Sequence, residues 1–356
     1  MGNRFCDQLG LENGHTFVIG EAGSNWRMGT PKRDLKMALE LIDVAVEAAC
    51  DAVKFQVYRP ETVYVPNAGN SDYLSHSGIT EPITDIFRDL SMPYEMIPRL
   101  ADHCRERGIL FMASAFSVAD ARQVDPYTPV HKIASYEISH VRLLESIAST
   151  GKPLVLSTGA SDPEDIEIAL KCHRDGDGGG VCLMQCTARY PAEVDSLNLL
   201  ALRTLAQQFG TPVGLSDHSR DPLLAPVMAV ALGARVIEKH YTLNNRLPGP
   251  DHAFALEPDE LKVMVRAIRD AEKARGSGVK EVLPAEEELR HYARRGLQAT
   301  QDIEPGTLLE EGVNFDILRP GKQRLGMHPR WIDCAHGHRA TRRIKVGDGI
   351  TEGDYA

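Results

Sequence analysis

Apolar positions in this chain form short runs that alternate with segments of helical periodicity. The first apolar run spans residues 17–23, and Leu35, Leu39, Ile42 and Val46 then recur every three or four residues. A short apolar run bounded by polar residues is typical of a buried strand, whereas the second spacing places side chains on one face of a helix. The opening therefore predicts a strand followed by a helix.

The same alternation continues through most of the chain. Seven further strands are expected at residues 51–56, 110–116, 132–137, 153–159, 181–186, 212–218 and 235–240. Eight strand–helix units over about 250 residues predict an α/β fold, the (β/α)8 or TIM barrel. A doubly wound open sheet is the alternative, but no glycine-rich phosphate motif follows the first strand.

Two segments depart from this rhythm. Residues 57–92 form a longer connection than a barrel needs, which favours a lid or a substrate-recognition role. After a final helix the composition changes, so we expect a barrel domain at 1–276, a polar linker at 277–292 and a small β-rich domain at 293–356. Such a small domain is marginal alone and is expected to dock on something.

Each expected strand turns polar at its carboxyl end. The carboxyl ends of barrel strands converge on one face, so these side chains are expected to surround a single site. Packing alone does not explain polar residues at every strand end. The residues concerned are Glu21; Lys54 and Gln56; Ser114 and Phe116; Lys132, Ser135 and Glu137; Ser157 and Thr158; Gln185 and Thr187; Ser216, Asp217 and His218; Glu238, Lys239 and His240.

These residue types suit an anionic substrate and a metal ion. Lys54 and Lys132, with serine hydroxyls nearby, are what a phosphate group requires. His218 and His240, on neighbouring strands, would place two imidazoles on one divalent cation and leave coordination positions open for a substrate oxygen.

Taken singly, the same residues have plainer interpretations that the sequence leaves open. Either histidine alone could be structural, and either lysine could form a salt bridge with Glu21 or Glu137. Ser135 and Ser157 could cap the helices that follow them. The joint pattern, rather than any one residue, favours a catalytic site.

Charge and cysteine usage narrow the class of protein. The formal net charge of −10 argues against a nucleic-acid-binding face, although it does not exclude a small anionic substrate. Seven cysteines without paired spacing suit reduced thiols, and Cys182 and Cys186 are expected in the core rather than on zinc. Without a signal segment or a membrane-length apolar run, we expect a cytoplasmic protein with no membrane partner.

Seven strand-end motifs resemble the sialic acid synthases, which condense phosphoenolpyruvate with an N-acetylated hexosamine into nine-carbon 2-keto sugar acids. A Pro248-Gly-Pro-Asp segment and a C-terminal part similar to the antifreeze-like (SAF) domain of those enzymes extend the resemblance. The motifs are Glu21-Ala-Gly-Ser-Asn, Asp51-Ala-Val-Lys-Phe-Gln, Lys132-Ile-Ala-Ser-Tyr-Glu, Leu156-Ser-Thr-Gly, Cys186-Thr-Ala-Arg-Tyr-Pro, Gly214-Leu-Ser-Asp-His and Glu238-Lys-His-Tyr-Thr.

The resemblance implies a role for each matching residue. His218 and His240 would bind Mn²⁺ or Mg²⁺, and Glu21 and Glu137 would handle protons. It also implies a homodimer in which the SAF domain covers the barrel mouth of the partner. The phosphoenolpyruvate contacts would be Lys54, Gln56, Ser114, Lys132, Ser135, Ser157 and Ser216. The sugar contacts would be Phe116, Tyr190, Asp251 and Arg319 of the partner subunit, and Gln185 and Thr187 are further expected substrate contacts.

Some residues depart from the usual pattern of these enzymes. Ala188 stands where Asn is frequent, and Tyr241 and His252 favour relatives acting in spore-coat, legionaminic or pseudaminic acid synthesis. Two other functions stay open. One is a pyruvate aldolase or lyase that uses Lys132 or Lys239 as a Schiff-base nucleophile. The other is a carbohydrate-binding protein without turnover.

Overall fold

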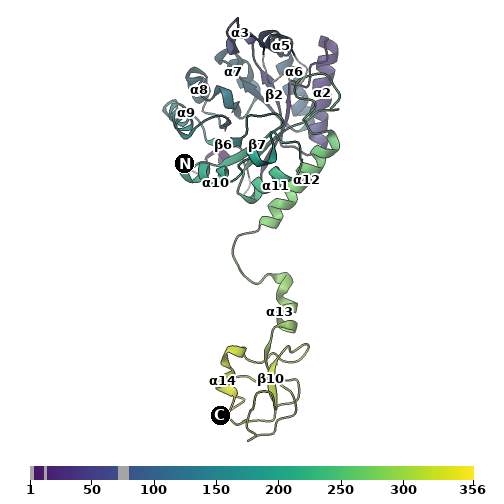
Figure 1. Ribbon diagram of the computed structural model, residues 1–356, viewed down its shortest axis with the longest axis vertical. Coiled ribbons are helices and arrows are strands. Elements are labelled where there is room, and N and C mark those ends of the chain that lie inside the picture. Colours follow the sequence, from purple (N-terminus) through teal and green to yellow (C-terminus); the bar gives the residue numbers. More distant parts are fainter. Residues whose placement is uncertain (1–3, 12–13, 71–79) are drawn as a thin grey trace. The chain divides into compact units, whose positions relative to one another are not determined.

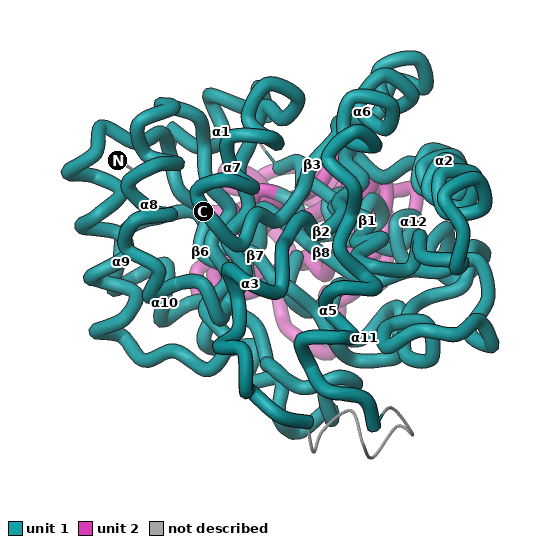
Figure 2. Tube along the Cα trace, turned by 90° about the horizontal axis from the view of Figure 1, so that it is seen from above, with its two compact units in different colours: residues 1–276 teal, residues 277–356 magenta. Residues whose placement is uncertain are grey.

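The computed structural model describes residues 4–11, 14–70 and 80–356 of the chain. The chain divides into two compact units, residues 1–276 and 277–356, which Figure 2 shows in different colours. Each unit encloses its own cluster of buried apolar side chains. The units are therefore described separately.

The first unit is a closed barrel, which confirms the expected fold class. In the described part of the chain, eight parallel strands pair in sequence order, and β8 returns to β1 with His240 beside Glu21. The strands are β1 (Phe17–Gly23), β2 (Ala52–Val57), β3 (Leu110–Ala115), β4 (His131–Ile133), β5 (Leu154–Ser157), β6 (Val181–Cys186), β7 (Val213–Asp217) and β8 (Val236–His240).

Helices surround this barrel (Figures 1 and 2). They pack apolar faces such as that of Leu41 and Ile42 against the outward side chains of the strands. No helix in the described ranges is both long and apolar enough to cross a bilayer. The helices are α2 (Pro31–Glu47), α6 (Met96–Arg107), α7 (Val118–Val124), α8 (Val141–Ala148), α9 (Pro163–Asp175), α10 (Ala201–Phe209), α11 (Leu224–Ala231) and α12 (Pro258–Arg275).

The fourth strand is shorter than the sequence predicts. It ends at Ile133, and the turn η2 (Ser135–Glu137) follows where three more strand residues were expected. The hydroxyl of Ser135 accepts a hydrogen bond from the main-chain N–H of Gly159 at 3.0 Å, so it ties this turn to the loop after β5. Glu137 therefore lies on a turn above the strand rather than on it.

The connection at 57–92 is partly helical. It contains α3 (Pro60–Val63) and α5 (Ile83–Asp89), whereas residues 71–79 of this segment lie outside the described residues. Tyr58, before α3, packs its ring 4.7 Å from that of Phe87 on α5. The role of this segment as a lid stays a prediction.

A short helix fills the amino-terminal end of the barrel. In α1 (Arg4–Gln8), Phe5 and Cys6 join an apolar cluster with inward side chains such as Ile19 and Met112. A Cβ atom on Gly180 would lie 2.1 Å from the main-chain nitrogen of Phe5. Glycine at this position therefore lets α1 pack directly against the start of β6.

The second unit contains a small antiparallel sheet. Strands β9 (Gly296–Ala299) and β10 (Phe315–Leu318) pair antiparallel over a core that includes Leu297, Phe315 and Ile344. A helix, α13 (Glu287–Ala293), occupies part of the segment expected to be a linker. Its glutamate, leucine and arginine residues are good helix formers, which accounts for this difference.

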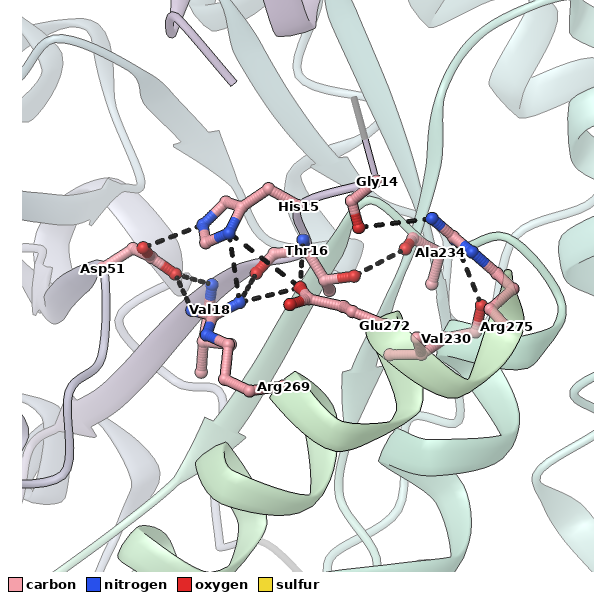
Figure 3. A network of polar contacts seen from close by, with 10 residues as sticks. All are labelled: Gly14, His15, Thr16, Val18, Asp51, Val230, Ala234, Arg269, Glu272 and Arg275. Carbon is pink, nitrogen blue, oxygen red and sulfur yellow. Dashed lines mark hydrogen bonds and ion pairs between the residues drawn. The ribbon is translucent and has the colours of Figure 1, made fainter. Parts of the chain in front are cut away.

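Polar contacts tie α12 to the first strand, as Figure 3 shows. Arg269 donates hydrogen bonds at 2.8 Å to Asp51, to Glu272 and to the carbonyl oxygen of Thr16. Asp51 in turn accepts the main-chain N–H of Val18 at 2.7 Å. One guanidinium thus joins the last helix to the start of both β1 and β2 and helps to close the barrel.

We expect Arg269→Met to lower the free energy of unfolding by about 2 kcal/mol, because it leaves two partly buried carboxylates without their cation. Urea denaturation followed by circular dichroism measures this loss. The matched control is Arg266→Met, which changes an exposed arginine on the same helix. Equal stability losses in the two variants would contradict the proposed closure.

This contribution should also depend on pH. Burial acts to raise the pKa of Asp51, but hydrogen bonds from His15 and Val18 and the charge of Arg269 outweigh it and lower that pKa. Stability from a depressed carboxyl pKa is fully present above the unfolded value of about 3.9 and is lost as pH falls through the folded value. The difference between wild type and Arg269→Met should therefore shrink in acid, below about pH 4.

Candidate active site

The inner surface of the barrel changes from apolar to polar along each strand. Successive strand residues point to opposite faces, so inward positions recur at every second residue. In β8 this places Val236 in the apolar layer, Glu238 one step higher and His240 at the top. Lys54 and Lys132 lie inside the barrel as well, each with only 2% of its surface exposed.

Lys54 is held by two carboxylates and a hydroxyl. Its Nζ lies 2.7 Å from Glu21 Oε2 and 3.7 Å from Glu238 Oε2, and it donates to Ser114 Oγ at 2.8 Å. Gln56 donates to the other oxygen of Glu21 at 3.1 Å. The salt bridge considered for Lys54 and Glu21 is therefore present, and it lies within the predicted group of strand-end residues.

Lys132 reaches the same carboxylate from the other side. Its Nζ donates to Ser157 Oγ at 2.8 Å and lies 3.9 Å from Glu238 Oε1, which also accepts from Ser216 Oγ at 3.1 Å. Glu238 therefore bridges the two lysines. Sequence reasoning gave Glu238 no role, although its position two residues before His240 on one strand was the available signal.

Burial perturbs the ionisable groups of this interior. It lowers the pKa of Lys132, with the charge of Glu238 opposing the shift, and it raises the pKa of Glu137 to about 7 against the charge of Lys132. One oxygen of Glu137 is buried without a hydrogen-bond partner among the described residues. Buried polar atoms are rarely left unpaired, so this oxygen indicates a place for a hydrogen-bond donor such as water or substrate.

The two histidines meet at the top of the barrel, with ring centroids 5.6 Å apart. His218 Nδ1 lies 2.8 Å from the carbonyl oxygen of Thr187. A carbonyl only accepts, so Nδ1 carries the proton, and Nε2 of the neutral ring has its lone pair available for a ligand. Burial lowers the pKa of His240 well below its usual value, so this imidazole is neutral.

Aromatic and acidic side chains surround the histidines. The ring of Tyr190 stacks on His218 at 4.0 Å, and Phe254 lies 5.2 Å from His240. Asp251 Oδ2 is 3.8 Å from His240 Nδ1. Tyr190 and Asp251 thus lie beside the histidines, and their expected contact with a sugar stays a prediction.

Phe116 lies just beyond the end of β3. It is partly buried, and its ring packs edge-on against Tyr58 at 5.2 Å. The aromatic contact therefore links the third strand to the segment that begins after β2.

The structure corrects the prediction for Gln185. Cys182, Met184 and Cys186 are the inward residues of β6, so Gln185 faces outward and donates to the carbonyl oxygen of Leu197 at 3.1 Å. Cys186 takes the inward place instead, with its sulfur 3.8 Å from His218 Nδ1. Gln185 therefore does not face the interior of the barrel as the sequence predicts.

Thr187 also has a different role from the expected one. Its hydroxyl donates to the carbonyl oxygen of Ser196 at 2.9 Å, so the side chain turns toward the loop after β6. Only its own main-chain carbonyl reaches the site, where it orients His218. The predicted contact between the Thr187 side chain and substrate is not supported.

The positions of Lys239, Ser135 and Ser157 exclude three roles that the sequence left open. Lys239 points to the outer side of the wall, where it pairs with Asp217 at 2.6 Å, so it is not available as a Schiff-base nucleophile. Ser135 and Ser157 do not cap helices, since α8 begins after His140 and α9 after Asp162.

Arg319 belongs to the second unit. It follows β10 and is exposed, and its proposed contact with a sugar stays a prediction.

Known proteins are similar to this chain in sequence and in fold. The chain is 38% identical over 354 residues to the spore coat polysaccharide biosynthesis protein SpsE of Bacillus subtilis, which covers 95% of this chain and 93% of the relative. It is 34% identical over 342 residues to a pseudaminic acid synthase of Campylobacter jejuni, with 95% and 96% covered.

A solved structure agrees with these relatives. The N-acetylneuraminic acid synthetase of Leptospira borgpetersenii, crystallised with citrate, is 31% identical with a TM-score of 0.68, covering 78% of this chain and 91% of that chain. The NeuB family matches residues 41–280. These matches confirm the resemblance to sialic acid synthases that the strand-end motifs predicted, and the chain belongs to the NeuB family.

Proposed function

We propose that this protein condenses phosphoenolpyruvate with an N-acylated hexosamine, forming a carbon–carbon bond and releasing phosphate. The product would be a nine-carbon 2-keto sugar acid of the sialic, legionaminic or pseudaminic type. The observation that carries the proposal is the pair of buried lysines, Lys54 and Lys132, below two imidazoles in one barrel. The synthases among the relatives support it.

The lysines and hydroxyls would hold the two anionic groups of phosphoenolpyruvate. Lys54 and Lys132 supply positive charge, and Ser114 and Ser157 already contact them. Negative charge grows on the phosphate as its C–O bond breaks, and fixed donors stabilise such charge strongly where water is excluded. Gln56, Ser135 and Ser216 would complete this set.

The histidines fit a divalent cation, Mn²⁺ or Mg²⁺. His218 has Nε2 available because Thr187 engages Nδ1, and His240 Nδ1 is buried without a hydrogen-bond partner among the described residues. No larger group of metal-binding side chains occurs in the described ranges, so water and substrate would supply the remaining ligands. When bound, the cation would polarise the sugar aldehyde.

The carboxylates would move protons. C3 of phosphoenolpyruvate attacks the aldehyde carbon, water adds at C2, and phosphate then leaves. Glu137, with a pKa raised to about 7, is suited to accept the proton of that water, because a general base works best near the ambient pH. Glu21, paired with Lys54, would handle the second proton.

The sugar would lie nearer the mouth of the barrel. Tyr190, Phe116 and Asp251 would contact it, and the protein would act as a homodimer in which Arg319 of the partner subunit reaches the same sugar. Exchange of the C-terminal domain between subunits would make each site depend on both chains.

One competing reaction has an observation in its favour. Burial lowers the pKa of Lys132, and a lowered amine pKa is what a Schiff-base nucleophile needs. Treatment with pyruvate and borohydride distinguishes the two reactions. A stable adduct on Lys132 would indicate a pyruvate lyase, whereas the proposed synthase forms none.

The proposed activity is tested by phosphate release. Purified protein is incubated with phosphoenolpyruvate, Mn²⁺ and one sugar at a time: N-acetylmannosamine, its 6-phosphate, or a diacetamido-trideoxyhexose. We expect release with at least one sugar and formation of a nine-carbon 2-keto acid, detected by mass spectrometry. Phosphate release without any sugar, or none with every sugar, would contradict the proposal.

Replacement of either His218 or His240 by alanine should lower kcat/KM by about a thousandfold, since losing metal polarisation costs several kcal/mol. A chelator should lower kcat/KM of the wild type by a similar factor, and added Mn²⁺ should restore the activity. His103→Ala is the control, because His103 pairs with Asp43 on the outside of the barrel. Full activity in chelator would remove the metal from the mechanism.

Glu137→Gln should reduce kcat by about 10²–10⁴-fold, the usual contribution of a positioned base. If the ionised form acts, the wild-type rate falls as pH drops below about 7, and the variant loses this limb of the profile. Steady-state rates from pH 5.5 to 9 measure it. Glu106→Gln, on the exposed face of α6, should behave as wild type. If the rate of Glu137→Gln still falls below about pH 7 as in the wild type, another group is responsible for this pH dependence.

A further inference from the structure

A buried ion pair lies behind the two histidines, on the outer side of the barrel wall. Lys239 and Asp217 are each only 1% exposed, and their charged atoms are 2.6 Å apart. The ammonium also donates to the carbonyl oxygen and hydroxyl of Ser219 and, at 3.0 Å, to the carbonyl oxygen of Asp221. All these contacts therefore fall on residues 217–221.

The pair is adjacent to the histidines in both sequence and space. Asp217 immediately precedes His218, Lys239 immediately precedes His240, and the strand register places Asp217 opposite Lys239. Asp217 also accepts the main-chain N–H of Ser219 at 2.8 Å. The main chain is thus fixed on both sides of His218, and the ion pair joins it to the strand that carries His240.

Stability alone does not explain this pair. Burying two charges costs about as much as their attraction returns, and apolar residues of similar size often stabilise equally well or better. Two residues earlier on the same strand faces, Leu215 and Ile237 pack as ordinary core. Along both strands, the outward side chains change from apolar to charged at the height of the two imidazoles. A charged ammonium can hold the carbonyl groups of the following loop, which an apolar side chain cannot.

We propose that Lys239 and Asp217 are positioning residues that hold His218 and His240 at the separation required for a shared divalent cation. The inference rests on the proposed function, because it concerns the same cation. It assigns to the outer side of the wall a role in metal affinity. Groups that orient metal ligands typically change affinity by about 10–100-fold when they are removed.

The test measures Mn²⁺ affinity in the full-length protein by isothermal titration calorimetry, with thermal unfolding in parallel. Lys239→Met should lower both the Mn²⁺ affinity and the Tm, because it leaves the buried carboxylate of Asp217 without its cation. The informative variant is Lys239→Met with Asp217→Leu. An apolar pair should raise Tm above that of Lys239→Met, because no buried charge is left unpaired, while the Mn²⁺ dissociation constant stays about 10–100-fold higher than in the wild type.

Two further variants keep the test decisive. Arg220→Met removes a half-exposed ion pair with Glu260 from the same loop and should leave Mn²⁺ affinity unchanged. Asp217→Asn keeps the shape of the side chain but removes its charge, so it serves if the double variant does not fold. It should weaken Mn²⁺ binding by about tenfold.

The outcomes separate this inference from the proposed function. A double variant, or a folded Asp217→Asn, that binds Mn²⁺ as tightly as the wild type overturns the positioning role alone. Weakened binding in Arg220→Met as well would overturn it too, since any change to the loop would then suffice. A wild type that binds no Mn²⁺, or binds it equally after His218→Ala, overturns both the inference and the proposed metal site.

Discussion

The site depends on two ammonium groups buried inside the barrel, because each needs charged and polar partners around it. Lys54 and Lys132 have almost no contact with water, and a buried charge is costly unless it is paired and hydrogen-bonded. Glu238 lies between them, and Glu21 and the serine hydroxyls supply further contacts. These contacts offset the cost of burying the ammonium groups, and fixed charges shielded from water act on an anion more strongly than charges in water.

Strand alternation explains both the successes and the errors of the sequence-based predictions. The barrel was predictable because apolar runs and helical periods alternate over most of the first unit. Gln185 was misplaced because β6, Val-Cys-Leu-Met-Gln-Cys, is apolar on both faces, so the pattern does not show which residues point inward. Glu238 was named among the strand-end residues but received no role of its own, since its place between two lysines becomes visible only when the strands are paired.

Other features depend on contacts that no side-chain pattern encodes. The tautomer of His218 is set by the main-chain carbonyl of Thr187, and every residue type has such a carbonyl. The short helix α1 has five residues, too few to show helical periodicity. Glu137 was expected on a strand and lies on a turn, where the hydroxyl of Ser135 accepts a hydrogen bond from the distant main-chain N–H of Gly159. Local sequence indicates the elements, whereas tertiary contacts decide where they stop.

Helix α1 covers the amino-terminal end of the barrel, where Phe5 packs among inward apolar side chains. This layer lies on the opposite side of the lysines from the histidines. Under the proposed function, the smaller anionic reactant occupies the deep position and the sugar the shallow one. The two reactants would then share one end of the barrel, and a bound sugar would cover the anion beneath it.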